Sequence, residues 1–191
     1  MAEAGLCCQT APQDGSPSIR MEPEDVLDVA LGCRLMGASG WRYTAPYEPD
    51  FQVALDRLRE DTFRRGDYWW VGGSKYRDPD ERRPRPETLA ELVADEEVET
   101  EGTHSIIDCP RIVKTLPANP MEWATVDYCG TIIPMTDAEL TTVIGTTRPT
   151  TEHLDALVAK TSQARWVGRC TVLYSPSGSP DQLAFWGYSG D

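Results

Sequence analysis

The segment 165-RWVGRCTVLYSPSGSPDQLAFWGY-188 decides the fold of this chain. From Arg165 to Ser175 the residue types follow a period of two, which is typical of a β-strand with two different faces. Residues 176–180 (Pro-Ser-Gly-Ser-Pro) are turn-forming, and a second run with strand character extends from Gln182 to Tyr188. The sequence therefore predicts a C-terminal β-hairpin.

Helices and short strands are mixed in the sequence before this hairpin. The clearest helix begins at Asp50, a good N-terminal cap, and ends at Gly66, where a left-handed cap is expected. Its apolar residues share one stripe: Phe51, Ala54, Leu55, Leu58 and Phe63. Further helices are expected over about 86–102, 136–145 and 149–158, and short strands over 105–108 and within 125–135. This order predicts an α+β fold, with an antiparallel sheet and about four helices packed mainly on one face.

A single domain behind an N-terminal tail is expected. Residues 1–20 hold polar clusters, prolines and few large apolar groups, which is typical of a flexible tail. Residues 21–191 form the α+β domain, which opens with a short helix up to Leu31. A chain of 191 residues is long enough to bury one hydrophobic core.

The charge balance excludes one large class of partner. Eighteen Lys and Arg residues stand against 31 Asp and Glu residues, which gives a formal net charge of −13 at pH 7. Such a chain repels nucleic-acid phosphates and anionic lipid surfaces. We therefore expect no nucleic-acid partner and no membrane partner, and no apolar run approaches the length of a membrane span.

The cysteines and the first residues indicate a cytoplasmic protein. Six cysteines at uneven spacing do not resemble a disulfide framework, and no C-x-x-C pair is present. The basic start and long apolar stretch of a secretory signal are missing from the first residues. We expect reduced thiols, with neither a metal ion nor a cofactor.

One local group of side chains has catalytic potential. If residues 105–108 form a strand, His104 and Asp108 lie on one of its faces and could act as an acid–base pair, with Asp127 completing the group. Cys109 would then point to the opposite face, which argues against a local Cys–His pair. The alternative is structural, with a buried cysteine and a hydrogen-bonded histidine, and the reactivity of Cys109 stays open.

The most unusual feature is aromatic, because the chain has six Trp but only three Phe residues. Tryptophan and tyrosine suit surfaces that are both apolar and hydrogen-bonding. Consecutive rings in 68-YWW-70 cannot all face inward, so we expect a groove for a protein partner or for a small aromatic or apolar ligand. Its predicted lining consists of Trp41, Tyr43, Tyr68, Trp69, Trp70 and Arg77. Each ring could instead pack at the edge of the core.

Charges of both signs collect in neighbouring parts of the sequence. The loop over 75–86 carries Lys75, Arg77, Arg82, Arg83 and Arg85, while residues 95–101 hold five carboxylates. The basic loop could bind an anionic ligand or fold back onto the acidic segment, and we favour the second arrangement.

Four blocks of sequence carry a resemblance: 36-MGASGW-41, 63-FRRGDY-68, 101-EGTHSIID-108 and 185-FWGYSGD-191. In this order they resemble a group of small bacterial proteins of uncharacterised activity, which share MGxSG(W/Y), GTxSIxD and GYSxD blocks. The resemblance covers about residues 34–191. It implies that the residues before Leu35 are an addition and that the C-terminal residues through Asp191 belong to the fold.

Two functions fit these features. The first is a non-catalytic acidic protein, similar to an immunity protein or an inhibitor, that recognises a protein partner through the aromatic groove and the acidic segment. The alternative is a small enzyme of a specialised bacterial pathway, with an aromatic-walled pocket and acid–base chemistry at His104, Asp108 and Asp127.

Overall fold

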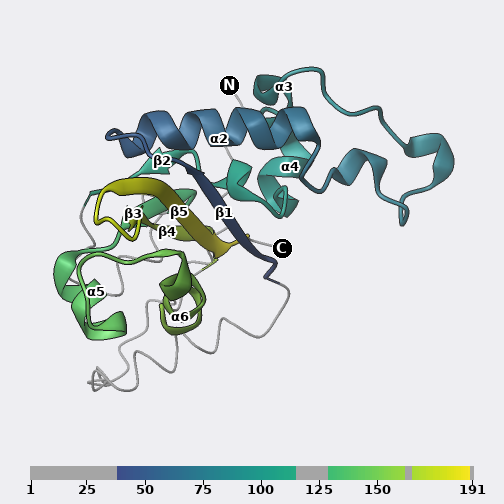
Figure 1. The fold of residues 1–191 in the computed structure, drawn as a ribbon. Helices are drawn as coiled ribbons and strands as arrows, with labels where there is room; N and C mark the ends of the chain where they lie inside the picture. Colours follow the sequence, from purple (N-terminus) through teal and green to yellow (C-terminus); the bar gives the residue numbers. More distant parts are fainter. Residues whose placement is uncertain (1–37, 115–128, 162–164, 190–191) are drawn as a thin grey trace, which may run out of the picture.

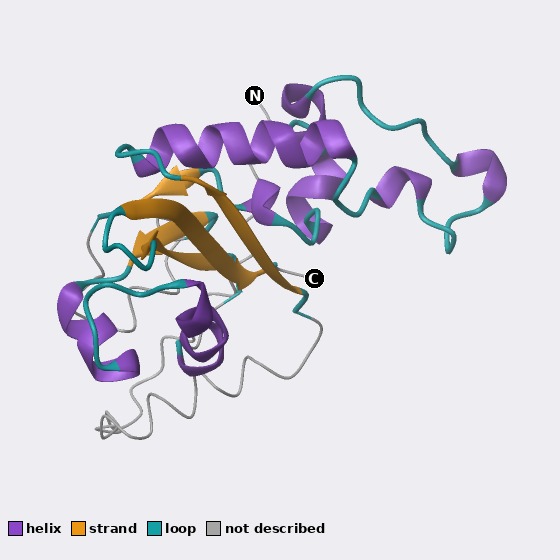
Figure 2. Cartoon of the chain, viewed as in Figure 1, coloured by secondary structure: helices purple, strands orange, loops and turns teal. Residues whose placement is uncertain are grey.

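The computed structural model describes residues 38–114, 129–161 and 165–189. A mixed sheet of five strands, in the order β1-β5-β4-β3-β2, forms its centre (Figures 1 and 2). The strands are β1 (Gly40–Pro46), β2 (Arg111–Ile112), β3 (Thr131–Pro134), β4 (Val167–Tyr174) and β5 (Pro180–Tyr188). The α-helices are α2 (Phe51–Arg65), α3 (Leu89–Val93), α4 (Glu96–Glu101), α5 (Asp137–Ile144) and α6 (Leu154–Lys160).

The predicted C-terminal hairpin is confirmed. Strands β4 and β5 pair antiparallel, with Gly168 opposite Gly187 and Tyr174 opposite Pro180. Strand β1 extends this part antiparallel along the other edge of β5.

The prediction of a wholly antiparallel sheet is wrong, because β4 pairs parallel with β3 and β3 pairs parallel with β2. The chain between β3 and β4 contains α5 and α6. A connection of this length returns the chain to the same end of the sheet, so the next strand runs parallel to the first.

Helices cover both faces of the sheet, where one face was expected (Figure 1). Leu183 and Phe185 of β5 pack in the cluster that includes Leu55 of α2. The intervening Ala184 and Trp186 pack instead with α5 and α6. All four of these β5 residues are at most 1% exposed, and such an uninterrupted apolar run is typical of a strand buried on both faces.

Helix α2 forms as its sequence predicts. The Asp50 carboxylate accepts hydrogen bonds from the backbone N–H groups of Gln52 at 2.8 Å and Val53 at 3.3 Å. At the other end, Gly66 has a φ of 67° and lies in the left-handed region that glycine tolerates best.

The single helix expected over 86–102 is two helices, which raises the count of α-helices in the described residues to five. Thr88 caps α3 in a capping box with Glu91, and Asp95 caps α4. One continuous helix would have crowded carboxylates at its negative C-terminal end. The break places Glu96, Glu97 and Glu99 in the first turn of α4 instead, where the helix dipole favours negative charge.

Several predicted elements involve residues that the structure does not describe. The tail over 1–20, the short helix up to Leu31 and residues 125–128 lie outside the described residues, whereas the strand expected within 125–135 is present as β3. No helix among the described residues combines the length and the apolar character needed to cross a bilayer.

Candidate functional site

Residues 105–108 do not form the expected strand. Ser105 caps a single 3₁₀ turn, η4 (Ile106–Asp108), by accepting a hydrogen bond from the Ile107 N–H at 3.2 Å. The period-two reasoning that placed His104 and Asp108 on one strand face is therefore wrong. A serine before a very short apolar run is the signal that favours a capped turn over a strand.

Asp108 stabilises the loop that begins at Gly102 by accepting hydrogen bonds. Its Oδ1 atom accepts hydrogen bonds from both the N–H and the hydroxyl group of Thr103, each at 2.7 Å. Burial raises the pKa of this carboxyl, and the two bonds from Thr103 act in the opposite direction. Within the described residues Oδ2 has no partner at hydrogen-bond geometry, although the Ser189 hydroxyl lies close enough to lower the pKa.

His104 lies on the partly exposed side of this loop. Its ring stacks on Trp69, with 4.5 Å between ring centroids and 15° between planes, and Nδ1 lies 3.5 Å from the Ser39 hydroxyl. His104 and Trp166 have φ values of 54° and 62°, which bulky residues rarely adopt. The Trp166 ring closes over Gly102, where an added Cβ would lie only 3.0 Å from the ring. Two strained residues thus meet at one loop, an arrangement that is common at functional sites.

Cys109 is not a candidate nucleophile. Its side chain is completely buried, and its Sγ lies 3.8 Å from the Trp166 carbonyl oxygen. Burial raises the pKa of the thiol, so the reactive thiolate is disfavoured. Asp127, the third predicted acid–base residue, lies outside the described residues. In the part of the chain that the structure describes, no group of three metal-ligating side chains converges.

The predicted aromatic groove is divided among different environments. The buried Trp41 ring packs against Gly168 and Gly187, where the absence of side chains leaves room for it. Tyr43 lies next to Trp41, with 6.2 Å between the ring centroids. Burial is the main reason that the pKa of Tyr43 rises to about 12. Tyr68 and Trp70 belong to a second core cluster. Trp69 is the partly exposed ring of the 68-YWW-70 run. Three consecutive rings cannot all face inward, so at least one of them was expected to be exposed.

The basic loop folds back onto the acidic segment, as expected. Arg77 forms an ion pair with Glu97 at 2.5 Å, and Arg83 pairs with Asp95 at 2.6 Å and also with Glu97. Trp70 strengthens this junction, because its Nε1 donates to the Arg83 carbonyl oxygen at 3.2 Å. The Arg83 guanidinium also lies 5.1 Å from the centroid of the Trp70 ring.

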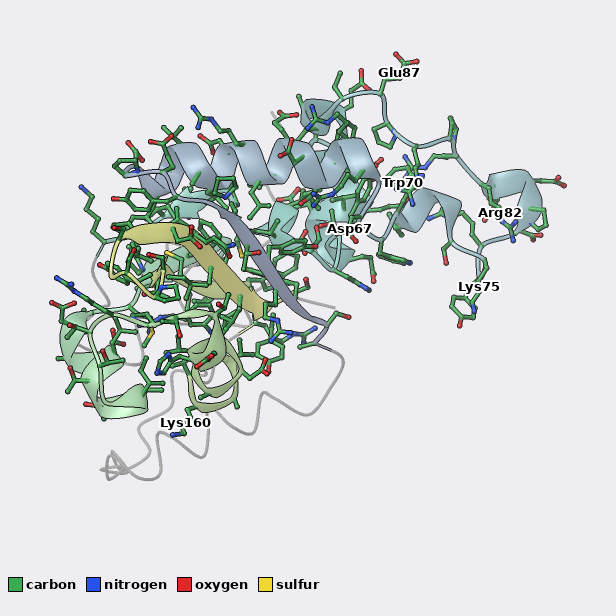
Figure 3. The ribbon with its side chains drawn as sticks, in the orientation of Figure 1. Asp67, Trp70, Lys75, Arg82, Glu87 and Lys160 are labelled. Carbon is green, nitrogen blue, oxygen red and sulfur yellow. The ribbon has the colours of Figure 1, made fainter. Side chains whose placement is uncertain are left out.

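This junction fixes the base of an arm, residues 74–87, that projects from the body of the molecule (Figures 1 and 3). Figure 3 shows Trp70 at the base of the arm, with Lys75 and Arg82 at its far end. Tyr76 is 87% exposed, the highest value among the large hydrophobic residues described as exposed. None of the residues in the short 3₁₀ turn η3 (Pro79–Glu81) is buried. Sequence reasoning noted the loop but missed Tyr76.

A hollow of about 420 Å³ lies between α5, α6 and the sheet. Arg169 of β4 reaches it, although its side chain is only 5% exposed, and pairs there with Glu139 at 2.6 Å. Sequence reasoning missed this residue too. The signal was an arginine at the centre of the first hairpin strand, which becomes informative only when both faces of the sheet are known to be covered.

Comparisons with protein-family models, with curated proteins and with solved structures yield no match to this chain.

Proposed function

We propose that this chain is a non-catalytic binding protein of the cytoplasm that recognises a protein partner through the arm over 74–87 and the adjoining acidic helix α4. The observation that carries the proposal is the exposed Tyr76 on an arm whose base is fixed by ion pairs. Enzymatic function has less support, because Cys109 is buried and the Asp108 Oδ1 atom is engaged in holding its own loop.

The arm has the physical properties of a recognition element. A tyrosine offers a large apolar surface and a hydroxyl group at little cost in side-chain entropy, and such residues often dominate the energy of an interface. The pairs of Arg77 and Arg83 with α4 fix the base of the arm before a partner arrives. This preorganisation reduces the conformational entropy that the arm loses on binding.

The charge of α4 indicates the chemistry of the partner. Asp95 and Glu97 are neutralised by the arm, whereas Glu96, Glu99 and Glu101 are exposed and form no ion pair within the described residues. Together with the net charge of −13, they favour a partner with a basic surface. Attraction of this kind weakens as salt is added.

A site-specific crosslinking experiment tests the proposal. A photoreactive phenylalanine analogue is placed at Tyr76, or at Tyr47 as a control, since Tyr47 is also exposed, at 39%, and lies at the end of β1 away from the arm. We expect a discrete crosslinked product with a host protein from Tyr76 and none from Tyr47. The product should diminish at high salt and in the variant Glu96→Gln/Glu99→Gln/Glu101→Gln.

The same experiment can overturn the proposal. Equal products from both positions, or no product from Tyr76 at low salt, would show that the arm is not the recognition element. A Tyr76 product that persists unchanged at high salt and in the triple variant would remove the assignment of a basic partner.

A further inference from the structure

The hollow between α5, α6 and β4 has the composition of a ligand site. Its lining contains two cations, Lys160 and Arg169, and one carboxylate, Glu139. Apolar side chains supply much of the remaining wall: Met135, Ala138 and Val143. The hollow is open to solvent, and its volume of about 420 Å³ is within the range of sites that hold small organic molecules.

Arg169 supplies a buried charge with unused hydrogen-bonding capacity. Its Nη2 atom donates to Glu139 Oε1 at 2.6 Å and contacts Met135 Sδ at 3.0 Å. Its buried Nε atom has no partner within the described residues. A guanidinium group has five N–H donors, so the bonds of Nη2 leave donors on the other nitrogens.

Both oxygen atoms of the carboxylate in the lining, Glu139, already accept hydrogen bonds. Glu139 accepts two hydrogen bonds from Thr136 through Oε2, at 2.8 and 2.9 Å, in the capping box of α5, while its Oε1 binds Arg169. It therefore neutralises Arg169 but not Lys160. Lys160 donates to the carbonyl oxygen of Val143 at 3.1 Å and forms no ion pair among the described residues. Among the described residues that line it, the hollow keeps one excess positive charge in a strongly acidic protein.

From this arrangement we propose that the hollow binds a small organic monocarboxylate. Arg169 and Lys160 hold the carboxylate group, and the apolar body of the ligand lies against Met135, Ala138 and Val143. One excess positive charge matches a monoanion better than a phosphate dianion, and the apolar wall favours an organic acid over an inorganic ion. This site is separate from the arm, so the proposal does not depend on the partner discussed above.

Benzoate is a suitable probe, and benzamide is its neutral analogue of nearly the same shape. We expect benzoate, titrated at constant ionic strength, to shift the backbone amide resonances of Ala138, Thr142 and Val143 in ¹⁵N-correlated NMR spectra. Benzamide should bind about tenfold more weakly, because it lacks the charge that strengthens hydrogen bonds to Arg and Lys.

Three variants locate the binding. Lys160→Gln should weaken benzoate binding about fivefold or more, by removing one charged donor. Ala138→Phe should abolish binding by filling the hollow without changing a charge. Lys75→Gln makes the same chemical change on the arm as Lys160→Gln (Figure 3) and should leave the affinity unchanged.

Several outcomes would overturn the proposal: no shifts at α5, equal binding of benzoate and benzamide, full affinity in Lys160→Gln or Ala138→Phe, or displacement of benzoate by an equal concentration of inorganic phosphate. None of these variants changes the buried Arg169. The test therefore does not depend on whether replacement of that residue is tolerated by the fold.

Discussion

At the scale of single residues, Asp108 has two opposing effects on stability. Its Oδ1 atom holds the loop through Thr103, while the burial of its charge is unfavourable. Since burial raises the pKa in the folded state, the unfolded chain loses this proton first as the pH rises. The stabilising contribution of the bound proton is therefore complete below the unfolded pKa, about 3.9, and is lost as the pH rises through the higher folded pKa.

Asp108→Asn tests this balance, because the asparagine oxygen can still accept both bonds from Thr103. As the pH rises from the unfolded to the folded pKa of Asp108, we expect the free energy of unfolding of the variant to increase relative to that of the parent. Above the folded pKa the difference should stay constant. Urea unfolding at a series of pH values from 3.5 to 8 measures this difference. Asp80→Asn, on the exposed arm, serves as the control and should give a nearly constant difference. Parallel curves for Asp108→Asn and the parent would contradict the expectation.

Gly168 illustrates a second constraint on a single residue, where space rather than charge decides. A Cβ added there would lie 2.7 Å from Cη2 of the Trp41 ring. We expect Gly168→Ala to lose about 2 kcal/mol of stability, as overpacked cores do. In the Trp41→Phe background the closest clash is absent, and the contacts with Ile132 Cγ1 and the Trp186 carbonyl oxygen, both at 3.1 Å, remain, so the same change should cost less. Denaturant unfolding of the parent, the two single variants and the double variant measures the coupling energy between Gly168 and Trp41. If the two losses of stability simply added, the contact with the Trp41 ring would be excluded as the cause.

At the scale of elements, the junction between the arm and α4 depends on Asp95. This residue caps α4 through the Glu97 N–H and also pairs with Arg83, whose hydrogen bond holds the pKa of Asp95 below its usual value. We expect Asp95→Ala to lose about 1 kcal/mol, the usual cost of an N-cap. Amide hydrogen exchange at Arg77 and Arg83 should accelerate as well, because the base of the arm is released.

Thr88→Ala is the matched control for this experiment, since Thr88 caps α3 and none of its hydrogen bonds involves the arm junction. It should cost a similar free energy and leave exchange at Arg77 and Arg83 unchanged. If both variants accelerated exchange there equally, the effect would reflect general destabilisation and not the junction.

Elements with strong local signals were predictable from sequence, and those decided by distant contacts were not. Asp50 and Gly66 mark the ends of α2 because each acts within its own helix turn. The break before Asp95 has no glycine or proline to mark it, and Arg77 and Arg83 stabilise it from a separate segment. The parallel pairing of β3 with β4 likewise depends on where α5 and α6 pack, which no local pattern encodes.

The candidate site was less predictable than the fold, for a related reason. The six tryptophans led to the prediction of an aromatic groove, but composition cannot distinguish a ring that lines a groove from one that fills the core. Trp41 is buried because Gly168 and Gly187 leave room for it on neighbouring strands. Arg169 could be interpreted only once α5 was known to cover its face of the sheet.

At the scale of the whole molecule, the tip of the arm, residues 78–82, adds little to stability. Residues 78–82 are all exposed, and the core clusters contain none of them. Replacing 78–82 with Gly-Ser-Gly-Ser-Gly should therefore change the free energy of unfolding by less than about 0.5 kcal/mol, the usual range for surface changes. Thermal and denaturant unfolding measure this, and a large loss would mean that the arm is part of the cooperative fold.

The arrangement of the strands also determines when the sheet can form during synthesis. Strand β1 precedes every other described strand in the chain, yet its neighbour in the sheet is β5, the last of them, with Tyr43 opposite Phe185. On the ribosome, β1 and the apolar face of α2 must therefore wait until β5 has left the exit tunnel. A nascent chain halted after α6 should remain protease-sensitive and attract chaperones, because the strand that pairs with β1 has not yet been made.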